Sequence, residues 1–215
     1  MTRAISGLYA VTPDDADTLR LAARAEAALA GGARLLQYRN KAATPASRLA
    51  QARALAALCR KFAVPLIIND HLELALAVDA DGLHLGAQDG SLAAARQRLG
   101  AGKLLGASCY DRLELALEAV NRGADYVAFG SFFPSGVKPG AVHAPLELLR
   151  EAKRSLPVPV VAIGGITPEN APRLIAAGAD GVAVISALFG ADDVGAAARR
   201  FSALFAQREL APGHS

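Results

Sequence analysis

Polar side chains with the chemistry to bind a phosphate gather in one short segment, Gln37-Tyr38-Arg39-Asn40-Lys41. Side chains alternate along an extended chain, so Gln37, Arg39 and Lys41 share one face if the segment continues a strand. A face with one amide and two cations suits a di- or triphosphate, because Arg offers a planar fork and Lys a point charge. The same residues could instead lie on the outer surface or in a solvated loop.

Two aspartates follow the next two apolar segments of the chain, Asp70 directly and Asp89 within a loop. Carboxylates beside a cationic, phosphate-binding face indicate Mg²⁺, held by one or two carboxylates and by phosphate oxygens. Asp70 could instead form a capping box with Glu73 at the start of a short helix. His84, a single histidine inside an apolar segment, is more typical of a hydrogen-bonded core residue than of a ligand.

A second candidate anion site lies later in the chain, at Gly164-Gly165 and at Ile185-Ser186. Backbone N–H groups of glycines, and the start of a helix, can point at a phosphate. An ordinary turn that needs flexible residues is the alternative. The loop 131–144 between these sites adds one cation, Lys138, which could fold over the site or remain solvated.

These residues must be positioned by an alternation of short apolar segments and helical patterns. The apolar segments are residues 8–12, 35–39, 66–69, 82–85, 104–108, 126–130, 160–163 and 181–185. The helical patterns are residues 19–30, 45–62, 71–78, 91–99, 112–122, 145–155, 167–177 and 192–207, with Asp111 expected to cap the fifth and Thr167-Pro168 to open the seventh.

Eight strand–helix units in 215 residues use about 27 residues each, the size of a unit in a (β/α)8 barrel. The sequence therefore predicts an α/β fold, a single (β/α)8 TIM barrel over residues 1–210, with 211–215 as a loose tail. A doubly wound open sheet is the alternative, but no G-x-G-x-x-G follows the first segment. In such a barrel the polar residues would meet at the C-terminal ends of the strands.

The composition narrows the class of protein further. A hydrophobic content of 53% predicts a packed core. With 23 Lys+Arg and 20 Asp+Glu, the net charge of +3 is too small for binding driven by nucleic-acid phosphates. Two cysteines, no long apolar span and no leader-like segment predict a cytoplasmic protein without a disulfide framework or membrane association.

Seven motifs in order closely resemble the thiamine-phosphate synthase (thiamine-phosphate pyrophosphorylase) family. They are Gln37-Tyr38-Arg39-Asn40-Lys41, Ile68-Asn69-Asp70, Gly82-Leu83-His84-Leu85-Gly86 with Asp89, Gly106-Ala107-Ser108, Ala124-Asp125-Tyr126-Val127-Ala128-Phe129-Gly130, Ala162-Ile163-Gly164-Gly165-Ile166, and Gly178-Ala179-Asp180-Gly181 with Ile185-Ser186. The resemblance runs from about residue 7 to residue 189. It implies the same barrel and a transferase of thiamine biosynthesis.

The resemblance also implies the reaction and the role of each residue. Two small phosphorylated heterocycles would be joined, 4-amino-5-hydroxymethyl-2-methylpyrimidine diphosphate and hydroxyethylthiazole phosphate, to give thiamine phosphate and pyrophosphate. The pyrimidine diphosphate would be bound by Gln37, Tyr38, Arg39, Asn40, Lys41, Asn69, Ser108 and Lys138. The thiazole phosphate would be bound by Ser135, Gly136, Val137, Gly165, Ile185 and Ser186, and Mg²⁺ by Asp70 and Asp89.

The implied chemistry needs charge stabilisation rather than a base. A thiazole ring nitrogen, which carries no proton, would attack the pyrimidine methylene in a dissociative displacement as pyrophosphate leaves. Catalysis would then fall to Arg39, Lys41, Ser108 and Lys138 together with Mg²⁺.

One position departs from the family. The usual Thr-x-Thr-Lys is replaced here by Ser135-Gly136-Val137-Lys138, so Val137 lacks the hydroxyl of the second threonine. The alternatives are a thiazole tautomerase-like barrel, and a non-catalytic paralogue that binds a thiazole or thiamine phosphate. The sequence is also compatible with a homo-oligomer.

Overall fold

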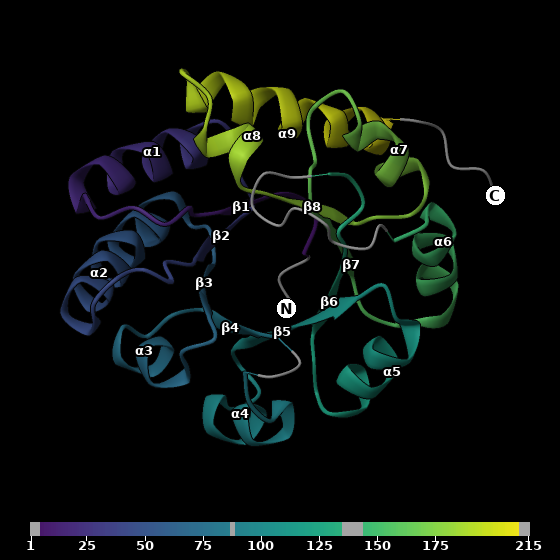
Figure 1. Cartoon of the computed structure of the whole chain (residues 1–215), viewed down its shortest axis with the longest axis horizontal. Helices are drawn as coiled ribbons and strands as arrows, with labels where there is room; N and C mark the ends of the chain where they lie inside the picture. The colour runs from purple at the N-terminus through teal and green to yellow at the C-terminus, as the bar shows by residue number, and fades with distance from the viewer. Residues whose placement is uncertain (1–4, 87–88, 135–143, 211–215) are drawn as a thin grey trace.

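The computed structural model describes residues 5–86, 89–134 and 144–210, and its centre is a closed barrel of parallel strands (Figure 1). Each strand pairs in parallel with its neighbours in chain order, and β8 pairs with β1. The strands are β1 Gly7–Val11, β2 Leu35–Tyr38, β3 Leu66–Asn69, β4 Gly82–Leu85, β5 Leu104–Tyr110, β6 Tyr126–Phe129, β7 Val160–Ile163 and β8 Gly181–Val184. The predicted (β/α)8 barrel is confirmed.

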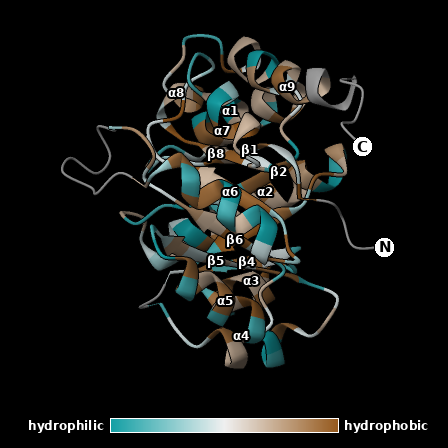
Figure 2. Cartoon of the chain, turned by 90° about the vertical axis from the view of Figure 1, so that its right-hand side faces the viewer, coloured by the Kyte–Doolittle hydropathy of each residue, from teal (hydrophilic) through white to brown (hydrophobic). Residues whose placement is uncertain are grey.

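Helices form a ring outside the strands (Figure 1). They are α1 Thr18–Ala30, α2 Pro45–Phe62, α3 Leu72–Ala77, α4 Leu92–Leu99, α5 Leu113–Asn121, α6 Leu146–Ser155, α7 Ala171–Ala176, α8 Ser186–Phe189 and α9 Val194–Leu210. The bands of apolar and polar residues along these helices in Figure 2 are those of helices with one buried side. The expected tail, 211–215, lies outside the described residues.

Helix α2 illustrates how local sequence sets an element. The Thr44 side chain accepts a hydrogen bond from the N–H of Ser47, and Pro45 occupies the first turn, where its missing N–H costs nothing. The helix ends at Ala63, whose left-handed φ of 55° stops the helical repeat. The predicted helix 45–62 is confirmed.

Three details of the predicted helices are wrong. Arg112, not Asp111, occupies the N-cap position of α5, and it makes no side-chain capping bond. Helix α7 begins at Ala171 rather than at Thr167, because Asn170 Oδ1 accepts the N–H of Thr167 and holds this stretch as a turn. The short helix α8 directly after β8 was not predicted, since four residues carry too little periodicity to be recognised.

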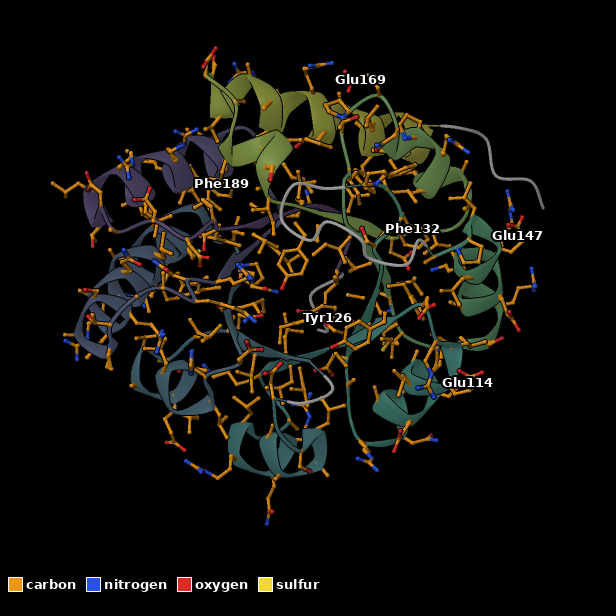
Figure 3. All side chains as sticks on the ribbon, viewed as in Figure 1. Glu114, Tyr126, Phe132, Glu147, Glu169 and Phe189 are labelled. Carbon is orange, nitrogen blue, oxygen red and sulfur yellow. The ribbon has the colours of Figure 1, made fainter. Side chains whose placement is uncertain are left out.

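The alternation of side chains along the strands creates two hydrophobic layers. One layer lies between the strands and the helices and includes Leu8, Ala10 and Leu36. The other fills the barrel interior and includes Tyr9, Val11, Ile5, Leu35, Ile67, Tyr126, Ala128, Val161 and Ala183. Figure 3 shows Tyr126 inside the ring of strands, whereas Glu114, Glu147 and Glu169 lie at the periphery of the molecule, outside that ring.

Aspartates at the N-terminal end of the barrel connect the strands in pairs. The carboxylates of Asp81, Asp125 and Asp180, each just before an even-numbered strand, accept a backbone N–H from the first or second residue of the preceding odd-numbered strand, at 2.9, 2.7 and 2.9 Å. Hydrogen bonds to a charged acceptor are stronger than those between neutral groups. These three bonds fix the register of β3 with β4, β5 with β6 and β7 with β8. They thereby determine which residues lie side by side at the C-terminal end of the barrel.

Candidate active site

A cavity of about 890 Å³ opens at the C-terminal end of the barrel, and every strand or the loop after it contributes to its lining. Ten of the residues predicted from the sequence to form a site line it. They are Gln37, Arg39, Lys41, Asn69, Asp70, Asp89, Ser108, Gly165, Ile185 and Ser186. Parallel strands end on the same face, which is where active sites of this fold lie.

The segment after β2 divides into two sets of side chains. Gln37, Arg39 and Lys41 line the cavity, as the alternation predicts, although β2 itself ends at Tyr38. Tyr38 and Asn40 point the other way and are buried: the Tyr38 hydroxyl donates to Gln51 Oε1 at 2.7 Å, and Asn40 Nδ2 donates to the same atom at 3.0 Å. We therefore revise the expected role of Tyr38 and Asn40 from ligand contact to support of the segment from helix α2.

Two residues after β1, Thr12 and Asp14, hold the cationic face in place and were missed by the sequence reasoning. The buried Thr12 hydroxyl donates to the carbonyl of Arg39 and accepts its N–H, both at 2.9 Å. Asp14 Oδ1 accepts the N–H of Lys41 at 2.6 Å and lies 3.7 Å from Arg39 Nη1. The only signal in the sequence was that Thr12 and Asp14 are polar and stand at the end of the first apolar segment. The ends of the first and second strands lie at the same end of the barrel.

Asp70 and Asp89 lie close enough to interact. Asp70 has a left-handed φ of 62° and its carboxylate accepts a 2.5 Å bond from Asn69 Nδ2, while Asp89 Oδ2 accepts the N–H of Gly86 at 3.1 Å. Burial, and then the neighbouring Asp89, raise the pKa of Asp70 to about 6. The capping-box alternative is wrong, because the helix that follows has His71 at its N-cap and no side-chain cap.

The carboxylate pair fits a hard divalent cation. A cation between two neighbouring carboxylates relieves the repulsion between their charges, and oxygen is the donor that Mg²⁺ prefers. Among the described residues, no three His, Cys, Asp or Glu side chains are grouped as a complete metal cage. A pair fits Mg²⁺, which usually takes one or two protein carboxylates and completes its shell with phosphate oxygens and water.

A chain of hydrogen bonds crosses the floor of the cavity and links five strands. Gln37 Nε2 donates to the Tyr9 hydroxyl at 2.8 Å, and this hydroxyl lies 2.8 Å from that of Tyr126. The Tyr126 hydroxyl lies 3.0 Å from His84 Nδ1, and His84 Nε2 lies 2.9 Å from Ser108 Oγ. Burial lowers the pKa of His84 to about 4 and raises those of both tyrosines, so the whole chain is uncharged. The expectation of a hydrogen-bonded histidine is confirmed.

Gly106 makes room for this chain. It pairs with His84 on one side and Tyr126 on the other, and both side chains occupy the space above it. A Cβ atom at this position would lie 2.1 Å from Tyr126 Cζ and 2.5 Å from His84 Nδ1. The hydrogen bond between His84 and Tyr126 therefore requires glycine at position 106.

The glycine pair after β7 has a structural reason of its own. Gly164 and Gly165 have φ values of 102° and 63°, and a Cβ at Gly165 would lie 2.4 Å from the carbonyl oxygen of Pro134. The chain after β6 crosses directly over them, with the N–H of Phe133 bonded to the carbonyl of Gly164 at 3.1 Å. The pair thus anchors the start of the loop that carries Ser135, Gly136, Val137 and Lys138, which themselves lie outside the described residues.

A closed (β/α)8 barrel with a cationic face and a carboxylate pair in one cavity at its C-terminal end has the architecture of a barrel enzyme, whose active site lies at that end. The family model "Thiamine monophosphate synthase" matches residues 8–188. The chain belongs to this family, and it is a transferase enzyme.

Individual relatives agree with this assignment. The chain is 54% identical over 213 residues to the thiamine-phosphate synthase of Nitrosospira multiformis, covering 99% of this chain and 91% of that one. It is 57% identical over 201 residues to that of Methylobacillus flagellatus, covering 94% and 96%. Among solved structures, thiamine phosphate pyrophosphorylase from Pyrococcus furiosus superposes with a TM-score of 0.85 at 37% identity, covering 96% of this chain and 98% of that one. Of the helices described here, none is both long enough and apolar enough to cross a membrane.

Proposed function

We propose that the protein joins 4-amino-5-hydroxymethyl-2-methylpyrimidine diphosphate to hydroxyethylthiazole phosphate, forming thiamine phosphate and releasing pyrophosphate. One observation carries the proposal: a single cavity contains a diphosphate-type end, with Arg39, Lys41, Asp70 and Asp89, and a backbone-rich end at Gly165. Two phosphorylated substrates that react with each other need two anion sites facing one space.

At the diphosphate end, Arg39 and Lys41 neutralise the departing pyrophosphate. The Arg39 side chain is only 19% exposed, so its charge acts where solvent screening is reduced. Thr12 and Asp14 hold its backbone and that of Lys41, so the two cations are positioned before the substrate arrives. Lys138, expected to join them, lies outside the described residues.

Asp70 and Asp89 would hold Mg²⁺, with Asn69 beside them. When bound, the cation supplies positive charge to the pyrophosphate oxygens as the leaving group departs. The carboxylates do not act as general bases, because the attacking thiazole nitrogen has no proton to give up.

The reaction is a displacement at the pyrimidine methylene carbon. The bond from this carbon to the diphosphate oxygen breaks, its electron pair leaves with pyrophosphate, and the thiazole nitrogen donates the pair that forms the new C–N bond. We propose a dissociative course because the described side chains supply charge stabilisation at the leaving group and none of them is needed as a base.

At the other end, the backbone around Gly165 and at Ile185 and Ser186 receives the thiazole phosphate. These residues line the cavity just after β7 and β8, whereas the carboxylate pair follows β3 and β4. The expected contacts at Ser135, Gly136 and Val137 complete this end in the proposal and lie outside the described residues.

The test is formation of thiamine phosphate from the two purified substrates, with Mg²⁺ and with a chelator. Magnesium-dependent product formation supports the proposal. Thiamine-phosphate binding without turnover under any metal condition would instead indicate the non-catalytic paralogue. Isomerisation of a thiazole carboxylate phosphate without condensation would indicate the tautomerase-like alternative.

We propose the cytosol as the place of this reaction. Cys59 and Cys109 are both buried and free, and burial raises the pKa of each thiol to about 12. Buried thiols that form no disulfide are typical of a reducing compartment.

A further inference from the structure

A chain of hydrogen-bonded side chains, the floor chain, crosses the bottom of the cavity and consists of Gln37, Tyr9, Tyr126, His84 and Ser108. Four of its members, Gln37, Tyr9, His84 and Ser108, line the cavity, whereas Tyr126 is fully buried and does not line it. A ligand can therefore meet those four side chains, while Tyr126 acts on it only through Tyr9 and His84.

Each inner member of the floor chain has one proton to share, so all of its hydrogen bonds must run in the same direction. A tyrosine hydroxyl donates one hydrogen bond, and a neutral imidazole carries one N–H and one acceptor nitrogen. Gln37 Nε2 donates to Tyr9, so the Tyr9 proton goes to Tyr126 and the Tyr126 proton goes to His84 Nδ1. His84 must then carry its proton on Nε2 and donate it to Ser108 Oγ.

The floor chain has only one other consistent arrangement, in which every bond is reversed. That state needs the Gln37 amide turned so that Oε1 accepts from Tyr9, and His84 protonated on Nδ1 instead of Nε2. If a single bond in the middle were reversed, one pair of neighbouring atoms would have two protons between them or no proton at all. Either case is costly in a buried site. The five groups therefore change direction together or not at all.

The direction decides what the cavity offers to a ligand. With His84 donating to its oxygen, the Ser108 hydroxyl turns its own proton toward the cavity and becomes a donor. At the other end, one N–H of Gln37 Nε2 is bound to Tyr9, which sets the orientation of the amide and leaves Oε1 as its acceptor and the second N–H as a donor. A ring with an amino group and an unprotonated ring nitrogen supplies the matching donor and acceptor, whereas an oxo group with a ring N–H supplies the opposite pair.

We propose that the floor chain, through its fixed direction, selects an aminopyrimidine over the corresponding oxopyrimidine, with Tyr126 as a positioning residue for both ends. This rests on the proposed function, since it concerns the pyrimidine half of the same cavity. The floor chain also depends on Gly106, because the lack of a side chain at this position allows His84 and Tyr126 to contact each other.

The first experiment reads the direction without any substrate. Long-range ¹H–¹⁵N NMR of the ligand-free protein reports which nitrogen of a neutral histidine carries the proton, and the signal of His84 is identified by its loss in His84→Asn. We expect Nε2–H in the wild type and a shift toward Nδ1–H in Tyr126→Phe, where Nδ1 no longer receives a proton. Nδ1–H in the wild type, or no change in Tyr126→Phe, would overturn the proposal.

The second experiment measures selectivity in binding, separated from chemistry. The probes are 4-amino-5-hydroxymethyl-2-methylpyrimidine and its 4-oxo analogue, alcohols that have no pyrophosphate to lose. We expect calorimetry to show the amino compound binding ~10–100-fold more tightly to the wild type, the effect of one or two mismatched buried hydrogen bonds. In Tyr126→Phe this ratio should fall by at least about tenfold; an unchanged ratio would contradict the proposal.

Tyr38→Phe is the matched control. It also removes one buried tyrosine hydroxyl with a 2.7 Å hydrogen bond, but on the side of β2 that faces away from the cavity. It should leave the His84 proton and the binding ratio unchanged; if it shifts them as Tyr126→Phe does, the effect is a general one and the proposal fails.

If Tyr126→Phe does not fold, Tyr9→Phe breaks the floor chain one bond earlier and is read in the same two ways. If the protein makes no thiamine phosphate but His84 carries Nε2–H and the aminopyrimidine is preferred, the proposed function fails while the floor-chain inference stands.

Discussion

His84 Nδ1 lies 3.0 Å from the hydroxyl of Tyr126 although strand β5 separates the two strands that carry them. The two side chains meet above Gly106, the β5 residue in register with both. A contact between second-neighbour strands needs the intervening residue to have no side chain. The floor of the cavity thus depends on a residue without a side chain in β5 and on one long polar side chain in each of the two neighbouring strands.

We predict that Gly106→Ala disrupts the floor of the site. The new methyl group has no room beside Tyr126 and His84, so the barrel must shift, at a cost of roughly 1–3 kcal/mol typical of an overpacked core. Urea unfolding measures the loss, and calorimetry with the aminopyrimidine alcohol measures weaker binding. Gly102→Ala is the control, because nothing lies within 4 Å of a Cβ there; equal stabilities of the two variants would contradict the packing argument.

A second prediction concerns the carboxylate pair in the absence of metal. The folded-state pKa of Asp70 is raised to about 6, so ionising it costs folding free energy, and stability falls as pH rises from about 4 through 6. Asp70→Asn removes this cost. Above pH 6 the variant should be more stable than the wild type by about 1 kcal/mol, a value reduced for solvent screening at this half-exposed group, and the gain should vanish near pH 4.

Thermal unfolding across this pH range, in the presence of a chelator, makes the measurement. Asp192→Asn, which changes an exposed aspartate, serves as the control for the loss of one carboxylate. Added Mg²⁺ should stabilise the wild type and not Asp70→Asn, and the variant should lose most activity. A variant less stable than the wild type at pH 7.5 without metal would show that the carboxylates do not repel each other.

The aspartates at the N-terminal end of the barrel give a third prediction, about stability alone. Asp125 accepts the N–H of Leu105 at 2.7 Å and pairs with Arg96, so Asp125→Ala leaves a buried backbone donor without its partner. We expect a loss of about 1–3 kcal/mol in urea unfolding, with the KM for both substrates unchanged. Glu118→Ala, which removes an exposed helix ion pair with Arg122, should cost less than about 0.5 kcal/mol; similar losses would contradict this role.

Sequence reasoning reached the barrel because eight apolar segments alternate with helical patterns, and it reached the cationic face because side-chain alternation survives past the end of β2. It did not reach Tyr9 and Tyr126, since a tyrosine in an apolar strand is ordinary core in sequence. Their hydroxyls become part of a site only when closure of the barrel brings the two hydroxyl oxygens, from β1 and β6, to 2.8 Å from each other across the interior. The same holds for Asp14, whose partners lie on the neighbouring strand.

The alternation after β2 gives the last prediction, a separation of activity from stability between neighbouring residues. Arg39 faces the cavity, so Arg39→Gln should lower kcat/KM for the pyrimidine diphosphate by about 10²-fold or more, through lost charge at the leaving group, and change stability little. Asn40 faces helix α2 and donates to the carbonyl of Asp15 at 2.7 Å, so Asn40→Ala should cost about 1–3 kcal/mol of stability. Steady-state kinetics and urea unfolding on both variants test this, and loss of stability in Arg39→Gln with full activity would place the cation outside the site.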